Sequence, residues 1–324
     1  MIWMRYLEMF NKEKNFVSAV IYVYKAEDRI EEFLRTVIRT FEKHFENSEI
    51  ICVDDCSTDK SIDIIKKIGQ EPSTSTNITI VNLSYYHGLE RAMNAGVELA
   101  IGDFVFEFDS TILDFDPEEI MTVYWHSLKG YDIVSASPDK KQKIMSNIFY
   151  KLFEYFTDSS YKMGTERFRI LSRRVINRIG SMNKTIPYRK AVYANCGLKT
   201  DNLRYHIVCM EKRDGVVDKK EKKYRFSLAV DSLILFTNLG YRFAIAMTFL
   251  MIFIVMCVAI YSITIYLLGN PVAGWTTTIL FLSFCFFGLF GILTIIIKYL
   301  QILVNLVFKR KRYSFESIEK ITKG

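Results

Sequence analysis

Two long uncharged runs constrain the fold of this chain more than any other feature of its sequence. Residues 244–268 contain no charged side chain, and residues 270–297 form a second run of the same kind. Each run exceeds the roughly 20 predominantly apolar residues that a membrane-spanning helix needs. The Gly269-Asn270-Pro271 turn predicts a helical hairpin with both ends on one side. The alternative, a hairpin buried in a soluble core, is less favoured because such uncharged runs are rare in soluble domains.

The basic residues around these runs predict how the hairpin is oriented. Five Lys and Arg residues lie within 219–225, four occupy 309–312, and the connecting loop has none. Because positive residues stay on the cytoplasmic side, we expect a multi-pass inner (plasma) membrane protein whose globular domain and both termini are cytoplasmic. The basic segments also suit anionic lipid headgroups. The net charge of +7 is therefore assigned to the bilayer surface, and no sequence motif indicates nucleic-acid binding.

Composition divides the 324-residue chain into four parts. Charged residues are spread through the amino-terminal two thirds, as in a soluble domain, and no apolar core typical of a signal peptide precedes them. The six cysteines contain no Cys-x-x-Cys pair, which favours free thiols. The predicted parts are a soluble domain (1–218), a basic membrane-surface helix (219–240), two transmembrane helices (241–308, at about 244–268 and 274–297) and a basic cytoplasmic tail (309–324).

Short β-branched and aromatic runs alternate with helical periodicity in the soluble part. Strands are predicted at 16–24, 49–53, 77–83 and 104–108, and helices at 26–45, 57–69 and 88–100. This alternation predicts an α/β fold with a mostly parallel sheet covered on both faces. Ligands of such sheets bind at the carboxyl ends of the strands. Asp54, Asp55 and Asp109 fall at such ends.

Four segments occur in an order and spacing that together are specific. They are VIYVYKAED (20–28), VDDCSTDKS (53–61), HGLERAMNAGVELAIGD (87–103) and FRILSRRVI (168–176). This series resembles family 2 glycosyltransferases of the GT-A (Rossmann-like) fold, and in particular the polyprenyl-phosphate glycosyltransferases related to dolichol-phosphate mannose synthase. Cys56 stands where the family has glycine. The resemblance extends to the basic stretch, the surface helix and the two spans.

The resemblance implies a nucleotide-sugar site at the first two strand ends. An ionised carboxylate offers only acceptors, which suits the donor groups of a base or ribose. By resemblance, Asp55 holds the base, with Asp54 and Glu27 close by, and Tyr24 lines the same pocket.

The resemblance also implies a divalent metal, Mg²⁺ or Mn²⁺, at the family's D-x-D motif. Such ions prefer carboxylate and phosphate oxygens and neutralise the departing diphosphate. Here the motif falls at residues 109–111, where Asp109 is kept and Thr111 replaces the second aspartate. Glu107 and Asp114 are alternative ligands, and Glu107 can join Asp109 on a regular strand because residues two apart share a face. Asp109 is thus expected in catalysis, donor binding and metal binding.

Further site residues follow from the later segments. Glu166 is the candidate catalytic carboxylate, displaced by one position from the family's pattern, and Arg169 is retained as a residue that can bind phosphate bidentately. Contacts with the lipid phosphate and the membrane are expected from Arg213, Lys223 and Arg225.

These features predict transfer of a sugar from a nucleotide-diphosphate sugar to a polyprenyl (undecaprenyl) phosphate at the bilayer. The acceptor phosphate is already anionic, so little general-base help is needed. Two alternatives remain open: a catalytically degenerate scaffold or partner, suggested by Cys56, Thr111 and Arg167, and a transferase that uses another membrane glycan. The resemblance also implies a homo-oligomer formed through the membrane segments.

Overall fold

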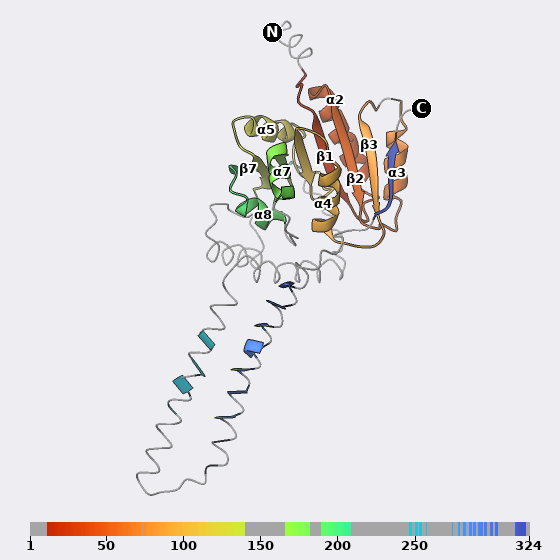
Figure 1. Ribbon diagram of the computed structural model, residues 1–324. Helices are drawn as coiled ribbons and strands as arrows, with labels where there is room; N and C mark the ends of the chain where they lie inside the picture. Colours follow the sequence, from red (N-terminus) through yellow and green to blue (C-terminus); the bar gives the residue numbers. More distant parts are fainter. Residues whose placement is uncertain are drawn as a thin grey trace. The chain divides into compact units, whose positions relative to one another are not determined.

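The computed structural model (Figure 1) describes residues 12–72, 74–139, 166–181, 189–208 and 315–321, and scattered positions between 246 and 303. The chain divides into two compact units. The first comprises Met1–Glu154, Asp158–Leu228 and Lys311–Gly324, and the second comprises Tyr155–Thr157 and Ala229–Arg310. The helices and strands described below all belong to the first unit.

Strands and helices alternate through the first half of this unit, and the bounds in chain order are as follows. They are β1 (Val17–Val23), α2 (Ile30–His44), β2 (Ser48–Asp54), α3 (Ser61–Gly69), β3 (Asn77–Leu83), α4 (Leu89–Leu99), β4 (Phe104–Phe108), α5 (Glu118–Ser127), β5 (Ile133–Pro138), β6 (Phe168–Ser172), α7 (Arg173–Ser181), α8 (Arg189–Asn195), β7 (Thr200–Tyr205) and β8 (Phe315–Ile321).

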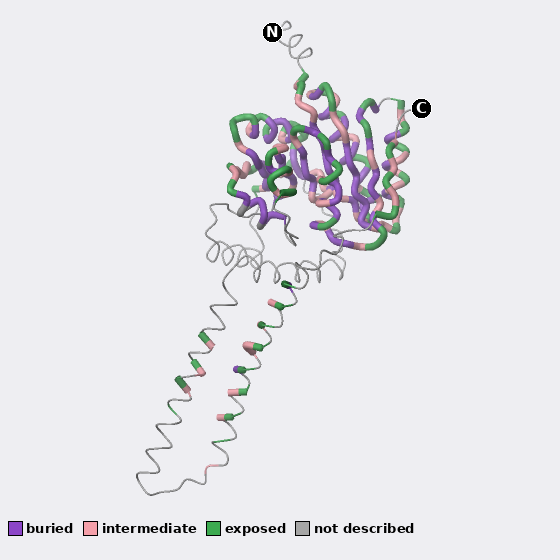
Figure 2. Tube along the Cα trace, viewed as in Figure 1, coloured by how far each residue is buried: buried purple, intermediate pink, exposed green. Residues whose placement is uncertain are grey.

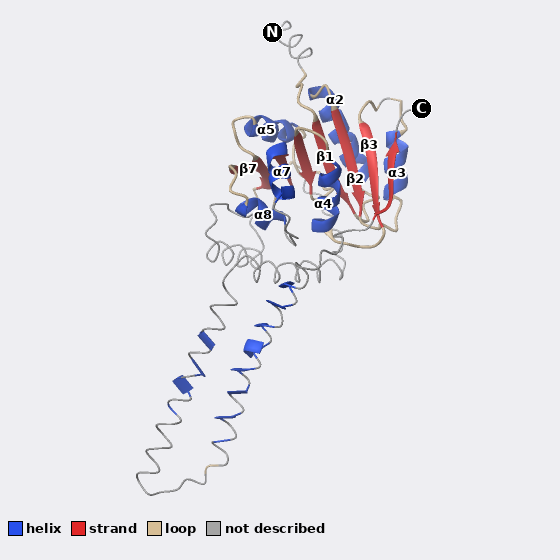
Figure 3. Ribbon diagram, in the orientation of Figure 1, coloured by secondary structure: helices blue, strands red, loops and turns tan. Residues whose placement is uncertain are grey.

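The strands form an eight-stranded sheet in the order β7-β5-β6-β4-β1-β2-β3-β8 (Figure 3). Pairing is parallel between β1 and β2, β1 and β4, β2 and β3, and β5 and β7. It is antiparallel where β6 joins β4 and β5, and where β8 joins β3. The predicted α/β fold with a mostly parallel sheet is therefore confirmed.

Apolar cores lie on both faces of the sheet, as Figure 2 shows by the buried purple strands between helices. On one face, α2 buries a stripe that includes Phe33, Val37 and Phe41. On the other face, α4 packs Ala92 and Met93 against the central strands. Burial on both faces explains why β1 is apolar at almost every position instead of alternating.

Gly96 lets α4 approach the sheet closely. A Cβ at this position would lie 2.4 Å from Cγ1 of Val20 and 2.6 Å from Cγ2 of Val53, both on β-branched side chains with little freedom to move. Gly96, one of three glycines in the 87–103 segment, is therefore required by packing.

The chain returns to this sheet after its apolar runs, which corrects the prediction of a tail at 309–324. Residues Phe315–Ile321 form β8, antiparallel to β3 at the sheet edge. Nδ2 of Asn82 donates to Oγ of Ser317 at 2.7 Å, and Lys66 and Glu319 form an ion pair at 2.6 Å. Part of the predicted tail is thus an edge strand of the first unit.

The predicted membrane segments fall almost wholly outside the described residues. The structure describes none of residues 219–240 and only scattered positions of 244–268 and 274–297. Among the residues that are described, none belongs to a helix with enough length and apolar character to span a membrane.

Candidate functional site

Four described strands bring polar residues to one end of the sheet, where the parallel strands terminate. Asp54 pairs with Val23 at the ends of β2 and β1, and Phe108 pairs with Phe168 where β4 ends and β6 begins. The carboxyl ends of the parallel strands therefore meet the amino end of antiparallel β6. The sequence-predicted gathering of carboxylates at this end of the sheet is what the structure shows.

Asp55 follows β2 and is fully buried. Its Oδ1 accepts a hydrogen bond from the backbone N–H of His87 at 2.6 Å, and its Oδ2 accepts from the N–H of Gly88 at 2.8 Å and the hydroxyl of Tyr22 at 3.0 Å. Burial raises the pKa of Asp55, although these three donors oppose the shift. Asp55 thus fixes the start of α4, and its contact with a nucleotide base stays a prediction.

Asp54 closes the turn that follows β2. Both of its carboxylate oxygens accept from the N–H of Ser57, at 3.3 and 3.1 Å, and burial raises the pKa of Asp54. Cys56, which precedes Ser57 in this turn, has a φ of 60°, in the left-handed region that favours glycine. This chain therefore carries a cysteine in a backbone conformation that glycine adopts without strain. We call Asp54, Asp55 and the N–H groups of Ser57, His87 and Gly88 the amide cluster.

Tyr24 and Glu27 lie on the neighbouring loop after β1. The half-buried Tyr24 packs on Tyr86 with ring centroids 4.8 Å apart. The exposed Glu27 accepts from the N–H of Lys60 at 3.1 Å, and its own N–H donates to Asp59 at 3.0 Å. Glu27 therefore joins the β1–α2 loop to the start of α3, and the predicted nucleotide contacts of both residues stay predictions.

Arg169 on β6 lies in the interior, with no part of its side chain exposed. Its Nη1 donates to Oε2 of Glu107 at 2.7 Å, and its Nη2 donates to Oδ2 of Asp109 at 2.8 Å and Oε2 of Glu166 at 3.0 Å. The ring of Tyr193 adds a cation–π contact at 5.5 Å. Three of the predicted site residues (Asp109, Glu166 and Arg169) thus meet, but the partners of the arginine here are carboxylates.

Arg189, at the start of α8, is a second buried arginine that the sequence analysis missed. Its Nη2 donates to Oδ1 of Asp109 at 2.7 Å, and its Nη1 forms an ion pair with Oε1 of Glu107 at 2.7 Å. Its Nε and backbone N–H both donate to Oε2 of Glu90 in α4, at 3.0 and 2.8 Å. We call Arg169 and Arg189, with Glu90, Glu107, Asp109 and Glu166, the guanidinium cluster.

The electrostatics of the guanidinium cluster favour an ionised Asp109. Burial alone would raise the pKa of Asp109, but the charges of Arg169, Arg189 and Lys190 outweigh it and hold that pKa well below its usual range. The phenol of Tyr193, which donates to Oε1 of Glu107 at 2.8 Å, has a pKa raised well above its ordinary value by burial and by that carboxylate. Tyr193 is therefore a neutral donor.

The two clusters are connected through the first turn of α4. Asp55 binds the N–H of Gly88, and two residues later Glu90 binds Arg189, which in turn binds Asp109. The start of α4 therefore links the residue that follows β2 to the residue that follows β4.

The predicted metal ligands do not form a metal site in the described part of the chain. Glu107 and Asp109 share a face, as the strand period predicts. Asp114, however, accepts from Nε of Arg167 at 2.8 Å and from the hydroxyl of Tyr205 at 2.9 Å. Among the described residues no group of three or more His, Cys, Asp or Glu is arranged to hold an ion. The described residues therefore form no all-protein ion cage, and the two carboxylates that the motif does offer, Glu107 and Asp109, already face Arg169 and Arg189.

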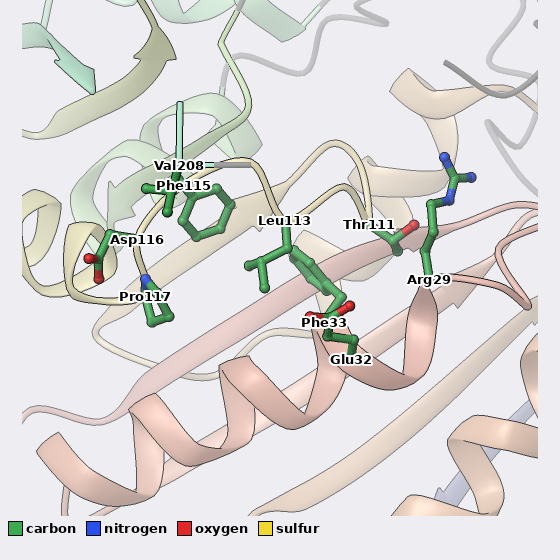
Figure 4. Close-up of a pocket in the computed structure, with 9 residues that line it drawn as sticks. All are labelled: Arg29, Glu32, Phe33, Thr111, Leu113, Phe115, Asp116, Pro117 and Val208. Atoms are coloured by element: carbon green, nitrogen blue, oxygen red, sulfur yellow. The ribbon is translucent and has the colours of Figure 1, made fainter. Parts of the chain in front are cut away.

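Thr111 lines a different feature, a pocket between α2 and the loop that precedes α5 (Figure 4). This pocket joins a cation, two carboxylates and several apolar side chains. Its lining residues are Arg29, Glu32, Phe33, Thr111, Leu113, Phe115, Asp116, Pro117 and Val208. The remaining predicted residues, Arg213, Lys223 and Arg225, lie outside the described residues, so their contacts with lipid stay predictions.

Comparison with known proteins finds relatives that are named as glycosyltransferases. An uncharacterised glycosyltransferase of Synechocystis is 30% identical over 189 residues, which are 56% of this chain and 58% of that protein. An undecaprenyl-phosphate 4-deoxy-4-formamido-L-arabinose transferase of Edwardsiella ictaluri is 32% identical over 131 residues, 40% of this chain and 39% of the relative. The chain thus spans less than two thirds of the length of these relatives.

Among solved structures, a mannosyltransferase of Pyrobaculum calidifontis in complex with GDP-Man and Mn²⁺ aligns with a TM-score of 0.45 at 15% identity, covering 65% of this chain and 64% of that one. The family profile described as Glycosyl transferase family 2 matches residues 18–180, about half of the chain, from β1 into α7. The chain therefore belongs to glycosyl transferase family 2.

Proposed function

We propose that this chain transfers a sugar from a nucleoside-diphosphate sugar to a polyprenyl phosphate at the cytoplasmic face of a membrane. Membership in glycosyl transferase family 2 supports the reaction class. Relatives named as undecaprenyl-phosphate sugar transferases, 31–32% identical over 40–44% of this chain, support the acceptor. The sugar itself is left open.

One observation carries the proposal: Asp55 and Asp109 lie at the carboxyl ends of β2 and β4, the two parallel strands that flank β1, and are joined through the start of α4. These strand ends are where ligands of open α/β sheets bind. A phosphate oxygen of the acceptor attacks the anomeric carbon, and the bond to the diphosphate breaks with its electron pair passing to the leaving oxygen. Because the nucleophile is already anionic, the protein contributes mainly positioning and charge stabilisation.

The return of the chain to its own sheet supports the membrane part of the proposal. Strands β7 and β8 flank the two apolar runs in sequence and belong to the same sheet. Any number of crossings between them must therefore be even, as a hairpin requires. The basic residues before and after the runs favour the cytoplasmic side for this unit, and Arg213, Lys223 and Arg225 are proposed to contact headgroups.

The test is transfer by the purified full chain in detergent. Labelled nucleotide sugars would be offered singly with undecaprenyl phosphate, and solvent-extractable label would be counted. We expect a labelled lipid with one donor and a loss of about 100-fold or more in Asp109→Asn, the scale seen when a charge-stabilising group is removed. Asp63→Asn, an exposed change on α3, is the matched control and should leave the rate unchanged. Absence of labelled lipid with every donor, from folded protein, would overturn the proposal.

A second candidate is a non-catalytic partner of another transferase. The observation that favours it is the capture of Asp109 and Glu166 by the same buried guanidinium. A partner of this kind has no need of the nucleotide site, so its affinity for nucleoside diphosphates should be the same in Asp55→Ala as in the parent protein. A folded Asp55→Ala with weakened nucleotide binding would instead favour the transferase.

A further inference from the structure

The carboxylates Glu107 and Asp109 occupy the place where the family's metal is expected, yet every oxygen of this pair faces a guanidinium nitrogen. In Glu107, Oε2 lies 2.7 Å from Nη1 of Arg169 and Oε1 lies 2.7 Å from Nη1 of Arg189. In Asp109, Oδ2 lies 2.8 Å from Nη2 of Arg169 and Oδ1 lies 2.7 Å from Nη2 of Arg189. Each guanidinium thus bridges both carboxylates, and together they enclose the pair.

This enclosure competes directly with a divalent cation. An ion bound by the pair would need carboxylate oxygens within roughly 2.0–2.6 Å, and those oxygens already have cationic partners at contact distance. Two guanidiniums also carry the same formal charge as one divalent ion. An arginine in a protein is not deprotonated, so this charge does not depend on metal supply.

The arginines are held where they are by groups outside the carboxylate pair. Arg189 is tied through Nε to Glu90 of α4, and Arg169 is tied through Nη2 to Glu166 at the start of β6. One of the four contacts, between Nη1 of Arg189 and Glu107, is an ion pair without hydrogen-bond alignment. Both arginine side chains are at most 2% exposed. Because these guanidiniums are buried and held by several partners, they cannot leave the carboxylate oxygens free for a metal ion.

The missing second carboxylate of the motif points the same way. Thr111 is neutral and lines the pocket beside α2, and Asp114 is engaged by Arg167 and Tyr205. Neither supplies the oxygen that the family's second aspartate would supply. The loss of a metal ligand and the gain of two cations therefore occur together at one site.

We propose that Arg169 and Arg189 take the place of the divalent cation at Asp109, so that Glu107 and Asp109 bind neither Mg²⁺ nor Mn²⁺ and transfer by this chain proceeds without either ion. The statement about transfer rests on the proposed transferase function. The replacement of the metal ion can be tested on the protein without any substrate. Arg169 and Arg189 act as positioning residues here, because they hold the carboxylates and supply fixed positive charge.

Binding of Mn²⁺ to the full chain in detergent tests the replacement without any turnover. Free Mn²⁺ would be followed by its electron paramagnetic resonance signal during titration. We expect the signal of the parent protein to match that of buffer. We expect Arg189→Met, which removes the guanidinium from one oxygen of each carboxylate while Tyr193 still donates to Oε1 of Glu107, to gain Mn²⁺ affinity by about 10-fold or more, the scale on which altered ligand surroundings change metal sites. One Mn²⁺ bound per chain in the parent protein, and lost in Asp109→Asn, would overturn the proposal, whether or not Arg189→Met folds.

The transfer assay with a chelator separates this inference from the proposed function. Labelled lipid formed equally well with and without EDTA supports both. Labelled lipid that disappears with EDTA supports the transferase and overturns the replacement of the ion. No labelled lipid, together with no Mn²⁺ bound, overturns the transferase and supports the replacement.

Discussion

The amide cluster and the guanidinium cluster both bury aspartates where parallel strands end, and they supply those carboxylates with different kinds of hydrogen-bond donor. Asp54 and Asp55 accept from neutral N–H groups and a hydroxyl, and burial raises their pKa values. Asp109 accepts from two guanidiniums, whose charges outweigh burial and lower its pKa. Aspartates at comparable strand ends therefore have pKa values shifted in opposite directions. Neutral hydrogen-bond donors offset the cost of desolvating a carboxylate only in part, whereas full positive charges more than offset it.

The largest expected difference comes from removing a cation. Arg169→Met removes the cation that three buried carboxylates share, and breaking a buried ion pair in this way costs about 3–5 kcal/mol. The measurement is denaturant unfolding of the full chain in detergent, followed by circular dichroism.

Arg174→Met is the matched control for that loss. Arg174 also pairs with an aspartate, Asp132, but its side chain is 65% exposed. Exposed pairs contribute about 0–1 kcal/mol, so this variant should unfold near the parent midpoint. Equal losses in the two variants would show that the buried cluster contributes no more than a surface pair.

Neutralising one aspartate in each cluster gives the next largest difference. Asp109→Asn removes one carboxylate partner from each of two buried guanidiniums, and we expect it to cost about 2–3 kcal/mol at pH 7, less than loss of the cation that three carboxylates share. Asp54→Asn keeps an oxygen that can accept from Ser57, and asparagine caps turns about as well as aspartate, so its cost should stay below about 1 kcal/mol. The same unfolding measurement applies to both. A larger loss in Asp54→Asn would contradict the comparison.

The pH dependence of those two variants should have opposite signs. The lowered pKa of Asp109 contributes stability that is present above the ordinary value near 3.8 and is lost as pH falls through the folded-state pKa. The raised pKa of Asp54 contributes stability that is present below that value and is lost as pH rises through the folded-state pKa.

Unfolding free energies at pH 3 and pH 7 check these signs, because the contribution of Asp109 is lost only below the ordinary value near 3.8. Asp109→Asn should cost less, relative to the parent protein, at the lower pH. Asp54→Asn should gain, relative to the parent protein, as pH is raised. Parallel pH profiles for the two variants would mean that the clusters do not differ in charge state.

The strand-end positions of Asp54 and Asp55 could be predicted from sequence, because strands β1 to β4 have apolar runs of the right length and both aspartates lie where β2 ends. Their amide partners His87 and Gly88 lie 32 and 33 positions beyond Asp55 and were not predicted. The guanidinium cluster was found only in part. Arg169 lies in a recognisable segment, but Arg189 and Tyr193 lie in none, and Arg189 reaches Glu90 across 99 positions of sequence. Only the folded chain brings such residues together.

The edge strand β8 was missed for another physical reason. Its residues, FESIEKI, alternate between exposed and half-buried positions and include Glu316, Glu319 and Lys320. An edge strand with one open face keeps charged residues, which guard against pairing with other chains. In sequence such a segment resembles a solvated tail, and only pairing with β3 distinguishes the two.

The smallest expected effect concerns the left-handed turn of the amide cluster. Cys56 has a φ of 60°, a conformation that costs a residue with a Cβ about 1–2 kcal/mol. Glycine removes that strain but loses more chain entropy on folding, about 0.5–1 kcal/mol. Cys56→Gly should therefore stabilise the chain by up to about 1 kcal/mol in denaturant unfolding, with the cost of Arg169→Met unchanged in its background. Cys56→Ala keeps the Cβ and removes only the thiol, so it should bring no gain. If alanine stabilised as much as glycine, the effect would belong to the thiol, and the backbone of this turn would not explain why the family has glycine there.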